Sequence, residues 1–359
     1  MRVLALVPSI YDTSPGQRYR IEQWQGGLKQ SGVEITFAAF EDRNLRDVLY
    51  ARGQWWKKGI EISKAFIRRL STVGQAKSYD LVYVFREAAL FGPSIFERIV
   101  HLWRVPLVFD FDDAIFVRYR SPANGWLSLL KAPGKTRTIC TLASHVMVGN
   151  NYLAEYARTF NQNVTVIPTT IDTNTYRVGS VRDTTSPVIG WTGSYSTVQH
   201  FDLLRPILSE LARRERFRVR VIGPSDYKLD GVDVEVVPWR SNTETQDLAA
   251  LDIGVMPLPD DLWSRGKCGC KALQYMGLGI PAVCSSVGMN TDLISDGENG
   301  FLANSAEEWI AKLTILLRSP ELRRKLGIAG RKTVEERFSA TAQVPRVYEV
   351  FQSAIGRAS

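Results

Sequence analysis

Three basic side chains surround a glycine-bearing turn in the second half of the chain, and they suit a diphosphate. Arg265, Lys267 and Lys271 stand close together in sequence, with glycines between them. The segment from about Lys267 to Met276 has a helical pattern, so we expect a helix whose first turn presents backbone N–H groups. Aligned N–H groups beside fixed cations favour a bound phosphate. The sequence therefore predicts a diphosphate site at this turn.

Two other turns combine glycine with hydrogen-bonding side chains. The first follows an apolar run and reads Thr192, Gly193, Ser194. Glycine there would let the backbone approach a ligand, and the hydroxyls would donate hydrogen bonds to it. A plain turn between a strand and a helix would show the same pattern. The second turn offers a similar set of groups at Gly288, Met289, Asn290 and Asp292.

Three aspartates end an apolar run in the first half, at Asp110, Asp112 and Asp113. Carboxylates at such a position are costly unless they are paired, so they need either a ligand or a cation. An aspartate could accept a hydrogen bond from a ligand at this position. Alternatively the three carboxylates form a structural network with a nearby arginine, for which the candidates are Arg18, Arg118 and Arg120.

A further glycine, Gly16, follows the first apolar run and is followed in turn by Arg18 and Arg20. We expect Gly16 and Arg18 to help bind an anion at the end of the first strand. Arg20 is equally consistent with an acceptor contact and with an ordinary helix surface. Glu87 is another carboxylate that follows an apolar run.

The segment from Leu273 to Val283 reads Leu-Gln-Tyr-Met-Gly-Leu-Gly-Ile-Pro-Ala-Val. It resembles the nucleotide-sugar site of retaining family 4 glycosyltransferases of the GT-B fold. Those enzymes carry two acidic residues separated by seven others, and the second acid precedes an Ala-Met-x-x-Gly-Thr-Pro-Val-Val run. Here Gln274 stands at the second acidic position and Gly266 at the first. The resemblance extends over most of the chain and is strongest between Val188 and Phe338.

The resemblance implies a retaining transfer of a hexosyl or N-acetylhexosaminyl unit. The donor would be a nucleoside diphosphate sugar. The basic first half of the chain, with Trp55 and Trp56, favours a glycan or lipid-linked acceptor of cell-envelope polysaccharide or glycolipid synthesis. Asp112, Asp113, Arg265 and Lys267 would act at the reaction, and no metal or other cofactor is expected. The donor-binding residues would be Gly16, Arg18, Thr192, Gly193, Ser194, Lys271, Gln274, Gly288, Met289, Asn290 and Asp292.

Two other functions fit the same residues. The missing acids at Gly266 and Gln274 favour a non-catalytic GT-B protein that binds nucleotide and acts as a scaffold. A GT-B enzyme that hydrolyses or epimerises nucleotide sugars is the second alternative. The cations at Arg265 and Lys267 argue for catalysis.

Apolar runs alternate with helical patterns along both halves, which predicts parallel sheets covered by helices on both sides. A doubly wound α/β domain in each half follows. The expected strands are Val3–Val7, Val33–Ala39, Leu81–Phe85, Pro106–Phe111, Val146–Val148 and Val164–Ile167, then Val188–Trp191, Arg218–Ile222, Val234–Val237, Ile253–Met256 and Ala282–Cys284.

Length and polarity divide the chain further. At 359 residues it exceeds one ordinary core. The polar segment Thr169–Pro187 is the expected linker. We predict an acceptor-binding domain over residues 1–175 and a nucleotide-sugar domain over 188–338, both Rossmann-like. A C-terminal helix within 339–359 is expected to return to the first domain. Ligands in such sheets lie at the carboxyl ends of the strands.

The net positive charge of the chain lies entirely in its first half. Residues 1–180 contain 23 Lys and Arg against 15 Asp and Glu, which accounts for the whole net charge of +8. Much of it falls in Arg43–Lys77, around Trp55 and Trp56. A basic amphipathic helix with tryptophans fits an anionic membrane surface. An ordinary helix packed on the first sheet fits equally well, and no nucleic-acid recognition motif is present.

Composition limits the class of protein. With 45% hydrophobic and 23% charged residues, the chain is typical of a globular protein, and no apolar run is long enough for a transmembrane span. The four cysteines form no disulfide framework and the three histidines no metal motif. We therefore expect a cytoplasmic protein, with the inner side of the plasma membrane as the site of any peripheral attachment.

Overall fold

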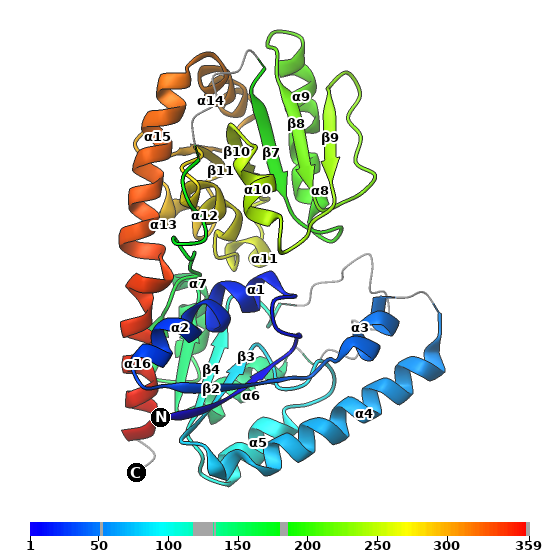
Figure 1. Cartoon of the computed structure of the whole chain (residues 1–359), viewed down its shortest axis with the longest axis vertical. Helices are drawn as coiled ribbons and strands as arrows, with labels where there is room; N and C mark the ends of the chain where they lie inside the picture. The colour runs from blue at the N-terminus through cyan, green and yellow to red at the C-terminus, as the bar shows by residue number, and fades with distance from the viewer. Residues whose placement is uncertain (51–52, 118–131, 133, 180–185, 357–359) are drawn as a thin grey trace. The chain divides into compact units, whose positions relative to one another are not determined.

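A computed structural model describes residues 1–50, 53–117, 132, 134–179 and 186–356. The chain divides into two compact units. The first unit comprises Met1–Thr169 and Gln343–Ser359, and the second comprises Thr170–Ala342. Each unit contains one six-stranded parallel sheet with helices packed against it (Figure 1). The predicted pair of doubly wound α/β domains is therefore confirmed.

The sheet of the first unit has the strand order β2-β1-β3-β4-β5-β6. Its central strands are buried throughout, as expected for apolar runs that are covered on both sides. Every predicted strand of this half begins and ends within one residue of its expected position. The strands are β1 (Arg2–Val7), β2 (Glu34–Ala39), β3 (Leu81–Phe85), β4 (Leu107–Phe111), β5 (His145–Val148) and β6 (Val164–Val166).

Helices of the first unit lie between successive strands along the chain, so that the strands can pair in parallel. A π-helical turn, Arg18–Glu22, joins α1 to α2. The helices are α1 (Pro15–Gln17), α2 (Gln23–Gln30), α3 (Arg43–Tyr50), α4 (Trp55–Gly74), α5 (Ile95–Leu102), α6 (Gly134–Leu142) and α7 (Asn151–Arg158).

Helix α4 has two different apolar sides. Ala65 and Val73 are fully buried on the side that packs onto the unit. On another side of the same helix, Trp56, Ile60 and Ile67 are 88%, 53% and 69% exposed. Residues spaced four and seven apart share one side of a helix, so these three form one stripe. The helix therefore packs on its own unit and also presents apolar side chains to solvent, next to α5 (Figure 1).

The sheet of the second unit has the order β12-β11-β10-β7-β8-β9. The predicted strands of this half are again placed within one residue, whereas β12 lies in a segment for which only a turn was expected. The strands are β7 (Val188–Thr192), β8 (Arg218–Ile222), β9 (Val234–Val237), β10 (Ile253–Met256), β11 (Ala282–Ser285) and β12 (Phe301–Ala303).

The helices of the second unit lie between its strands or after them along the chain. The short helices follow the carboxyl ends of β7, β10 and β11. The helices are α8 (Val198–Phe201), α9 (Arg205–Ala212), α10 (Glu244–Ala249), α11 (Leu262–Arg265), α12 (Cys270–Gly277), α13 (Asn290–Leu293), α14 (Ala306–Arg318) and α15 (Pro320–Thr333).

The helix expected from about Lys267 to Met276 begins later than the sequence predicts. Arg265 ends the short helix α11, and α12 starts only at Cys270. Gly269 between them has a left-handed backbone with φ of 67°, which breaks the helical pattern. Lys267 therefore lies in a connecting turn and not in the first turn of α12.

The last helix, α16 (Ala340–Gly356), begins in the second unit and belongs to the first unit from Gln343 onward. Its apolar side chains Val347 and Phe351 are fully buried. The segment expected as a linker begins where the units divide, but Tyr176 within it is 1% exposed and belongs to the second unit. Within the described residues, no helix is both long and apolar enough to cross a bilayer.

Candidate functional site

Two turns at the carboxyl edge of the second sheet pack against each other. Gly288, which follows β11, has a φ of 57°, and a Cβ there would lie 2.8 Å from the carbonyl oxygen of Arg265. A Cβ at Gly269 would lie 3.8 Å from Asn290 Oδ1. The structure therefore brings the 265–271 segment and the 288–290 turn together, although they are distant in sequence.

The three predicted cations of this edge differ in their surroundings. The Nζ of Lys267 lies 4.9 Å from the ring centroid of Trp263, and the Nζ of Lys271 lies 5.7 Å from that of Trp191. Arg265, by contrast, donates from Nε and Nη2 to the carboxylate of Asp260, at 2.7 and 3.1 Å. Asp260 therefore balances part of the positive charge of Arg265.

The start of α12 lies between these lysines. Its N-cap residue, Gly269, supplies no side chain to cap the helix, and Lys271 is the second helical residue. The first N–H groups of a helix have no acceptor within it. Lys267, Lys271 and this helix end therefore form a positively polarised region, which we call the anion site.

The turn after β7 uses two of its N–H groups for hydrogen bonds within the protein. The N–H of Gly193 donates to the carbonyl of Ile222 at 3.0 Å, and the N–H of Ser194 donates to Thr197 Oγ1 at 3.0 Å. A Cβ at Gly193 would lie 2.4 Å from the Trp191 ring. The glycine is required by packing, and both N–H groups that were expected to bind a diphosphate have internal acceptors.

Thr192 precedes this turn as the last residue of β7 and is 5% exposed. Its N–H donates to the hydroxyl of Tyr275 at 3.2 Å. This hydrogen bond holds the end of β7 against α12, the helix whose first residues belong to the anion site.

Gln274 is buried, with 3% of its surface exposed. Its Nε2 donates to Glu244 Oε1 at 3.1 Å. The same carboxylate accepts from the Tyr176 hydroxyl at 2.9 Å and from Trp239 Nε1 at 2.8 Å. Glu244, which the sequence analysis did not identify, thus places an acid next to the glutamine at the family's second acidic position. Gln274 is therefore hydrogen-bonded within the protein.

The 288–292 turn is mostly internal. Met289 is 6% exposed and Asn290 1% exposed, and Asn290 Nδ2 donates to the carbonyl of Ser285 at 3.0 Å. Asp292 is exposed, and its N–H bonds within the turn to the carbonyl of Met289. Asn290 is therefore the most deeply buried side chain of this predicted group.

Three buried polar atoms at this edge have no hydrogen-bond partner in the described structure. They are Asn290 Oδ1, Ser264 Oγ and His200 Nε2. A buried polar atom left without a partner costs about 1–3 kcal/mol, so each such atom needs an explanation. Ser264 and His200 were not predicted, because a single serine or histidine gives no sequence signal.

At the carboxyl edge of the first sheet, Asp112 and Asp113 are paired with an arginine that the sequence analysis missed. Arg86 directly follows β3, and its Nε donates to Asp112 Oδ1 while its Nη2 donates to Asp113 Oδ2, both at 2.7 Å. Arg86 adopts a left-handed backbone with φ of 57°. A Cβ at Gly16 would lie 2.8 Å from Arg86 Nη2, so the glycine makes room for this pair.

The third aspartate, Asp110, is separate from this pair. It is fully buried and accepts from Arg20 Nε at 2.7 Å, and it also bonds to the Tyr83 hydroxyl. Arg86 thus pairs with Asp112 and Asp113, and Arg20 pairs with Asp110. Arg18 is paired with Asp12 at 2.7 Å.

Two other residues of the predicted network lie outside the described residues, namely Arg118 and Arg120. Glu87, also noted from the sequence, is paired with Lys135 at 2.5 Å. Among the described residues, no three His, Cys, Asp or Glu side chains lie close enough together to hold a metal ion.

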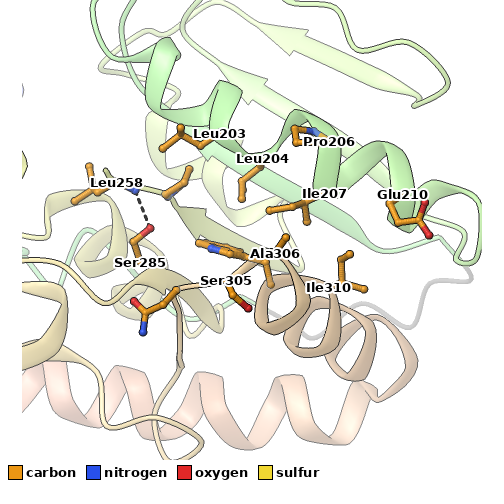
Figure 2. A pocket seen from close by; sticks show the side chains of 13 residues that line it. Leu203, Leu204, Pro206, Ile207, Glu210, Leu258, Ser285, Ser305, Ala306 and Ile310 are labelled. Carbon is orange, nitrogen blue, oxygen red and sulfur yellow. Dashed lines mark hydrogen bonds between the residues drawn. The ribbon is translucent and has the colours of Figure 1, made fainter. Parts of the chain in front are cut away.

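A cavity of about 490 Å³ lies elsewhere in the second unit, between α9 and α14 (Figure 2). Leu204, Ile207, Trp309 and Ile310 supply much of its apolar lining, and Ser285 Oγ accepts from the N–H of Leu258 at its edge. None of the predicted donor-binding residues lines it. The cavity is therefore distinct from the anion site.

Parts of the chain are similar in sequence to known proteins. Residues 186–319, which lie within the second unit, match the family described as "Glycosyl transferases group 1". A trehalose synthase of Pyrococcus horikoshii is 31% identical over 92 residues, which cover 26% of this chain and 22% of that protein. The sulfoquinovosyl transferase SQD2 of Arabidopsis thaliana is 27% identical over 162 residues, or 42% and 30% of the two chains. The chain thus spans less than a third of the length of these relatives.

Solved structures are similar over nearly the whole chain. A sucrose-phosphate synthase from Thermosynechococcus elongatus has a TM-score of 0.70 and 15% identity, covering 99% of this chain and 100% of that one. HepE from Anabaena, in a complex with UDP and glucose, has a TM-score of 0.69 and 15% identity, covering 98% and 100%. At such identities the likeness shows the fold, which is the predicted GT-B fold.

Proposed function

We propose that the chain is a glycosyltransferase that transfers a hexosyl or N-acetylhexosaminyl unit from a nucleoside diphosphate sugar, with retention, to a glycan or lipid-linked acceptor. The observation that carries this proposal is the match of residues 186–319 to a glycosyltransferase family, because the anion site lies within the matched segment. Lys267 and Lys271 would bind the diphosphate together with the first N–H groups of α12.

The proposed reaction needs few protein groups. The bond between the anomeric carbon and the diphosphate breaks, the acceptor oxygen bonds to that carbon, and the acceptor proton passes to the departing phosphate oxygen. Positive potential at the anion site stabilises the charge that grows on the diphosphate. Arg265, which is paired with Asp260, would contribute to this potential together with Lys267. No metal is required if these cations suffice.

Asp112 and Asp113 keep a proposed role in the acceptor half of the reaction. Their side chains are 8% and 15% exposed, and both accept from Arg86. Arg86 would hold the carboxylates in one orientation, so that an oxygen can accept from a sugar hydroxyl. The proposed acceptor class, cell-envelope polysaccharide or glycolipid, is supported by the basic charge of the first half and by the exposed Trp56 of α4.

Thermal-shift measurements with a panel of nucleotides and nucleotide sugars test the donor site. Binding raises apparent stability by mass action, so one nucleotide family should give a concentration-dependent shift in the wild type. HepE was solved with UDP, so uridine nucleotides come first in the panel. The shift should be lost in Lys267→Ala and kept in Lys332→Ala, whose side chain is 72% exposed. No shift with any donor would contradict the proposal.

A non-catalytic scaffold is the second candidate, and the burial of Gln274 against Glu244 favours it. A nucleotide-sugar hydrolase or epimerase is the third. Product analysis by mass spectrometry separates the three. A transferase gives a glycosylated acceptor, a hydrolase gives free sugar, an epimerase gives an isomeric donor, and a scaffold gives no product while still binding nucleotide.

We also propose that α4 attaches the chain to an anionic membrane surface, at the cytoplasmic side of the plasma membrane. Its solvent-exposed stripe of Trp56, Ile60 and Ile67 is flanked by Lys57 and Lys64. Tryptophan and aliphatic side chains insert at the level of the headgroups, and lysines are attracted to anionic lipids. Lys58 does not contribute, because it is 6% exposed and lies over the Trp55 ring.

Co-sedimentation with vesicles tests this attachment. Wild type should bind vesicles that contain phosphatidylglycerol more than vesicles of phosphatidylcholine alone, and less at high salt. The triple variant Trp56→Ser, Ile60→Ser, Ile67→Ser should lose binding. Ile328→Ser, which removes a 63% exposed isoleucine of the second unit, serves as the control. If the triple variant sediments like wild type, the proposal is wrong.

A further inference from the structure

His200 lies beside the anion site. It belongs to α8, and the next residue, Phe201, stacks on Trp191 with 5.4 Å between ring centroids. The Nζ of Lys271 lies 5.7 Å from the centroid of the same Trp191 ring. One tryptophan therefore contacts both the short helix that carries His200 and the second lysine of the anion site.

The imidazole of His200 is 8% exposed, and its Nε2 has no hydrogen-bond partner in the described structure. The other histidine that is buried to a similar degree, His145, bonds through its Nε2 to Thr165 Oγ1 at 2.9 Å, and its Nδ1 is also among the buried atoms with no partner in the described structure. Ser264 Oγ and Asn290 Oδ1, in α11 and α13, are unpartnered in the same way as His200 Nε2. Unsatisfied polar atoms therefore gather around one edge of the second sheet, where Lys267 and Lys271 also lie.

Charge and burial act together on this imidazole. Burial lowers the pKa of His200 to about 4, and the positive charges of Lys271 and Lys267 contribute to the same shift. Asp261, the N-cap residue of α11, opposes them. These three groups are the charges that act on the imidazole from α12, from the turn before it and from α11. His200 is consequently neutral at pH 7.

We propose that His200 is part of the anion site, and that a diphosphate bound there is accompanied by the uptake of one proton from solvent by its imidazole. A nucleotide sugar brings two negative charges to Lys267 and Lys271. They cancel the positive potential that disfavours a charged imidazole and attract the proton. The protonated Nε2 is then a donor next to an anion. This inference rests on the proposed nucleotide-sugar site and adds a proton-linked residue to it.

Linkage fixes the sign of the expected effect. Because the complex holds one more proton, affinity rises as the pH falls through the pKa of His200 in the complex, and it levels off near the ligand-free value. If the bound anion restores the ordinary pKa of about 6.5, the Kd at pH 5.5 is about tenfold lower than at pH 8. Nucleotide sugars are the right probes, because their diphosphates lack the terminal phosphate that titrates near pH 6.

The decisive experiment is calorimetry at several pH values with each nucleotide sugar of the thermal-shift panel. Wild type should show the tenfold change, His200→Asn should show little, and His145→Asn should behave like wild type. Equal pH dependence in wild type and His200→Asn would overturn the inference and leave the proposed function standing. Failure of every nucleotide sugar to bind at any pH would overturn both.

A measurement without ligand tests the same residue independently. The ring signals of the three histidines can be followed by NMR during a pH titration and assigned with the two asparagine variants. We expect the His200 signal to titrate near pH 4. Titration of His200 at pH 6 or above would overturn the inference even if nucleotides bind.

Discussion

The charged side chains at the carboxyl edges of the two sheets have different surroundings. In the first unit, Arg86 donates to Asp112 and Asp113, and Arg20 donates to Asp110. In the second unit, two lysines lie beside aromatic rings, and several buried polar atoms around them lack hydrogen-bond partners. The carboxylates of the first edge are thus paired with arginines, whereas buried polar atoms of the second edge have no hydrogen-bond partner within the described structure. A ligand should therefore stabilise the second unit more than the first.

Removing Arg20 should cause the largest change, because it leaves a buried carboxylate without its cation. We expect Arg20→Ala to lower the free energy of unfolding by about 3–5 kcal/mol, as for other broken buried ion pairs. Urea unfolding followed by circular dichroism measures it. Arg18→Ala, which breaks a pair whose Asp12 is 51% exposed, should cost at most about 1 kcal/mol. An equal loss of unfolding free energy in the two variants would show that the buried pair of Arg20 stabilises the protein no more than the surface pair of Arg18.

Restoring the family's second acid should destabilise the second unit. Gln274→Glu brings a carboxylate to about 3 Å from Glu244, where two ionised groups repel. We expect a loss of about 2–3 kcal/mol at pH 7.5, by comparison with other unsatisfied buried groups. The variant should recover as the pH falls, since one raised carboxyl pKa lets a proton bind. Gln199→Glu, at an exposed position, is the control. A variant as stable as wild type would show that the glutamine is not held by Glu244.

The two basic residues next to the α12 turn should differ in their effect on nucleotide-sugar affinity. Lys267→Ala should weaken binding by roughly 10–100-fold, the range for a lost charge-assisted hydrogen bond of about 1.5–3 kcal/mol. Arg265→Ala should weaken it only a few-fold, because Asp260 already balances the guanidinium. Calorimetry at pH 7.5 measures both. The reverse order would mean that Arg265 leaves Asp260 when nucleotide binds.

A methyl group at Gly16 should disturb the carboxyl edge of the first sheet modestly. A Cβ there would meet Arg86 Nη2 and Asp112 Oδ2 at 2.8 and 2.9 Å, so Gly16→Ala should cost about 1–2 kcal/mol. Gly26→Ala is the matched control, because nothing lies within 4 Å of its added methyl and alanine favours a helix. Thermal unfolding should move in opposite directions for the two variants. A stabilised Gly16→Ala protein would show that the Arg86 pair can rearrange at no cost.

Strand positions were predictable to within a residue because buried parallel strands read as uninterrupted apolar runs bounded by turn residues. The two sheets follow from that pattern and its alternation with helices. The break at Gly269 was not predictable, because a basic segment with two glycines fits both a continuous helix and two short ones. The strand β12 was missed because three residues, Phe301–Ala303, carry too little pattern.

The site was predicted in part. Lys267, Lys271 and Asn290 were found by residue type, and the structure gathers them at one edge. Partners were harder to predict, because an ion pair depends on distances that only the fold supplies. Arg86 and Asp112 are separated by many residues but joined at 2.7 Å by the pairing of β3 with β4. The internal use of the Gly193 and Ser194 N–H groups has the same cause.

The final helix also affects how the protein is made. Val347 and Phe351 of α16 are core residues of the first unit, and Phe351 packs 6.1 Å from Tyr83, centroid to centroid. A ribosome synthesises the whole second unit before it reaches these residues. The first unit, although translated first, therefore cannot complete its core until Val347 and Phe351 have been synthesised, while the second unit can finish folding earlier. A nascent chain should expose the apolar groove for α16 during this interval, which is when a chaperone would have a surface to bind.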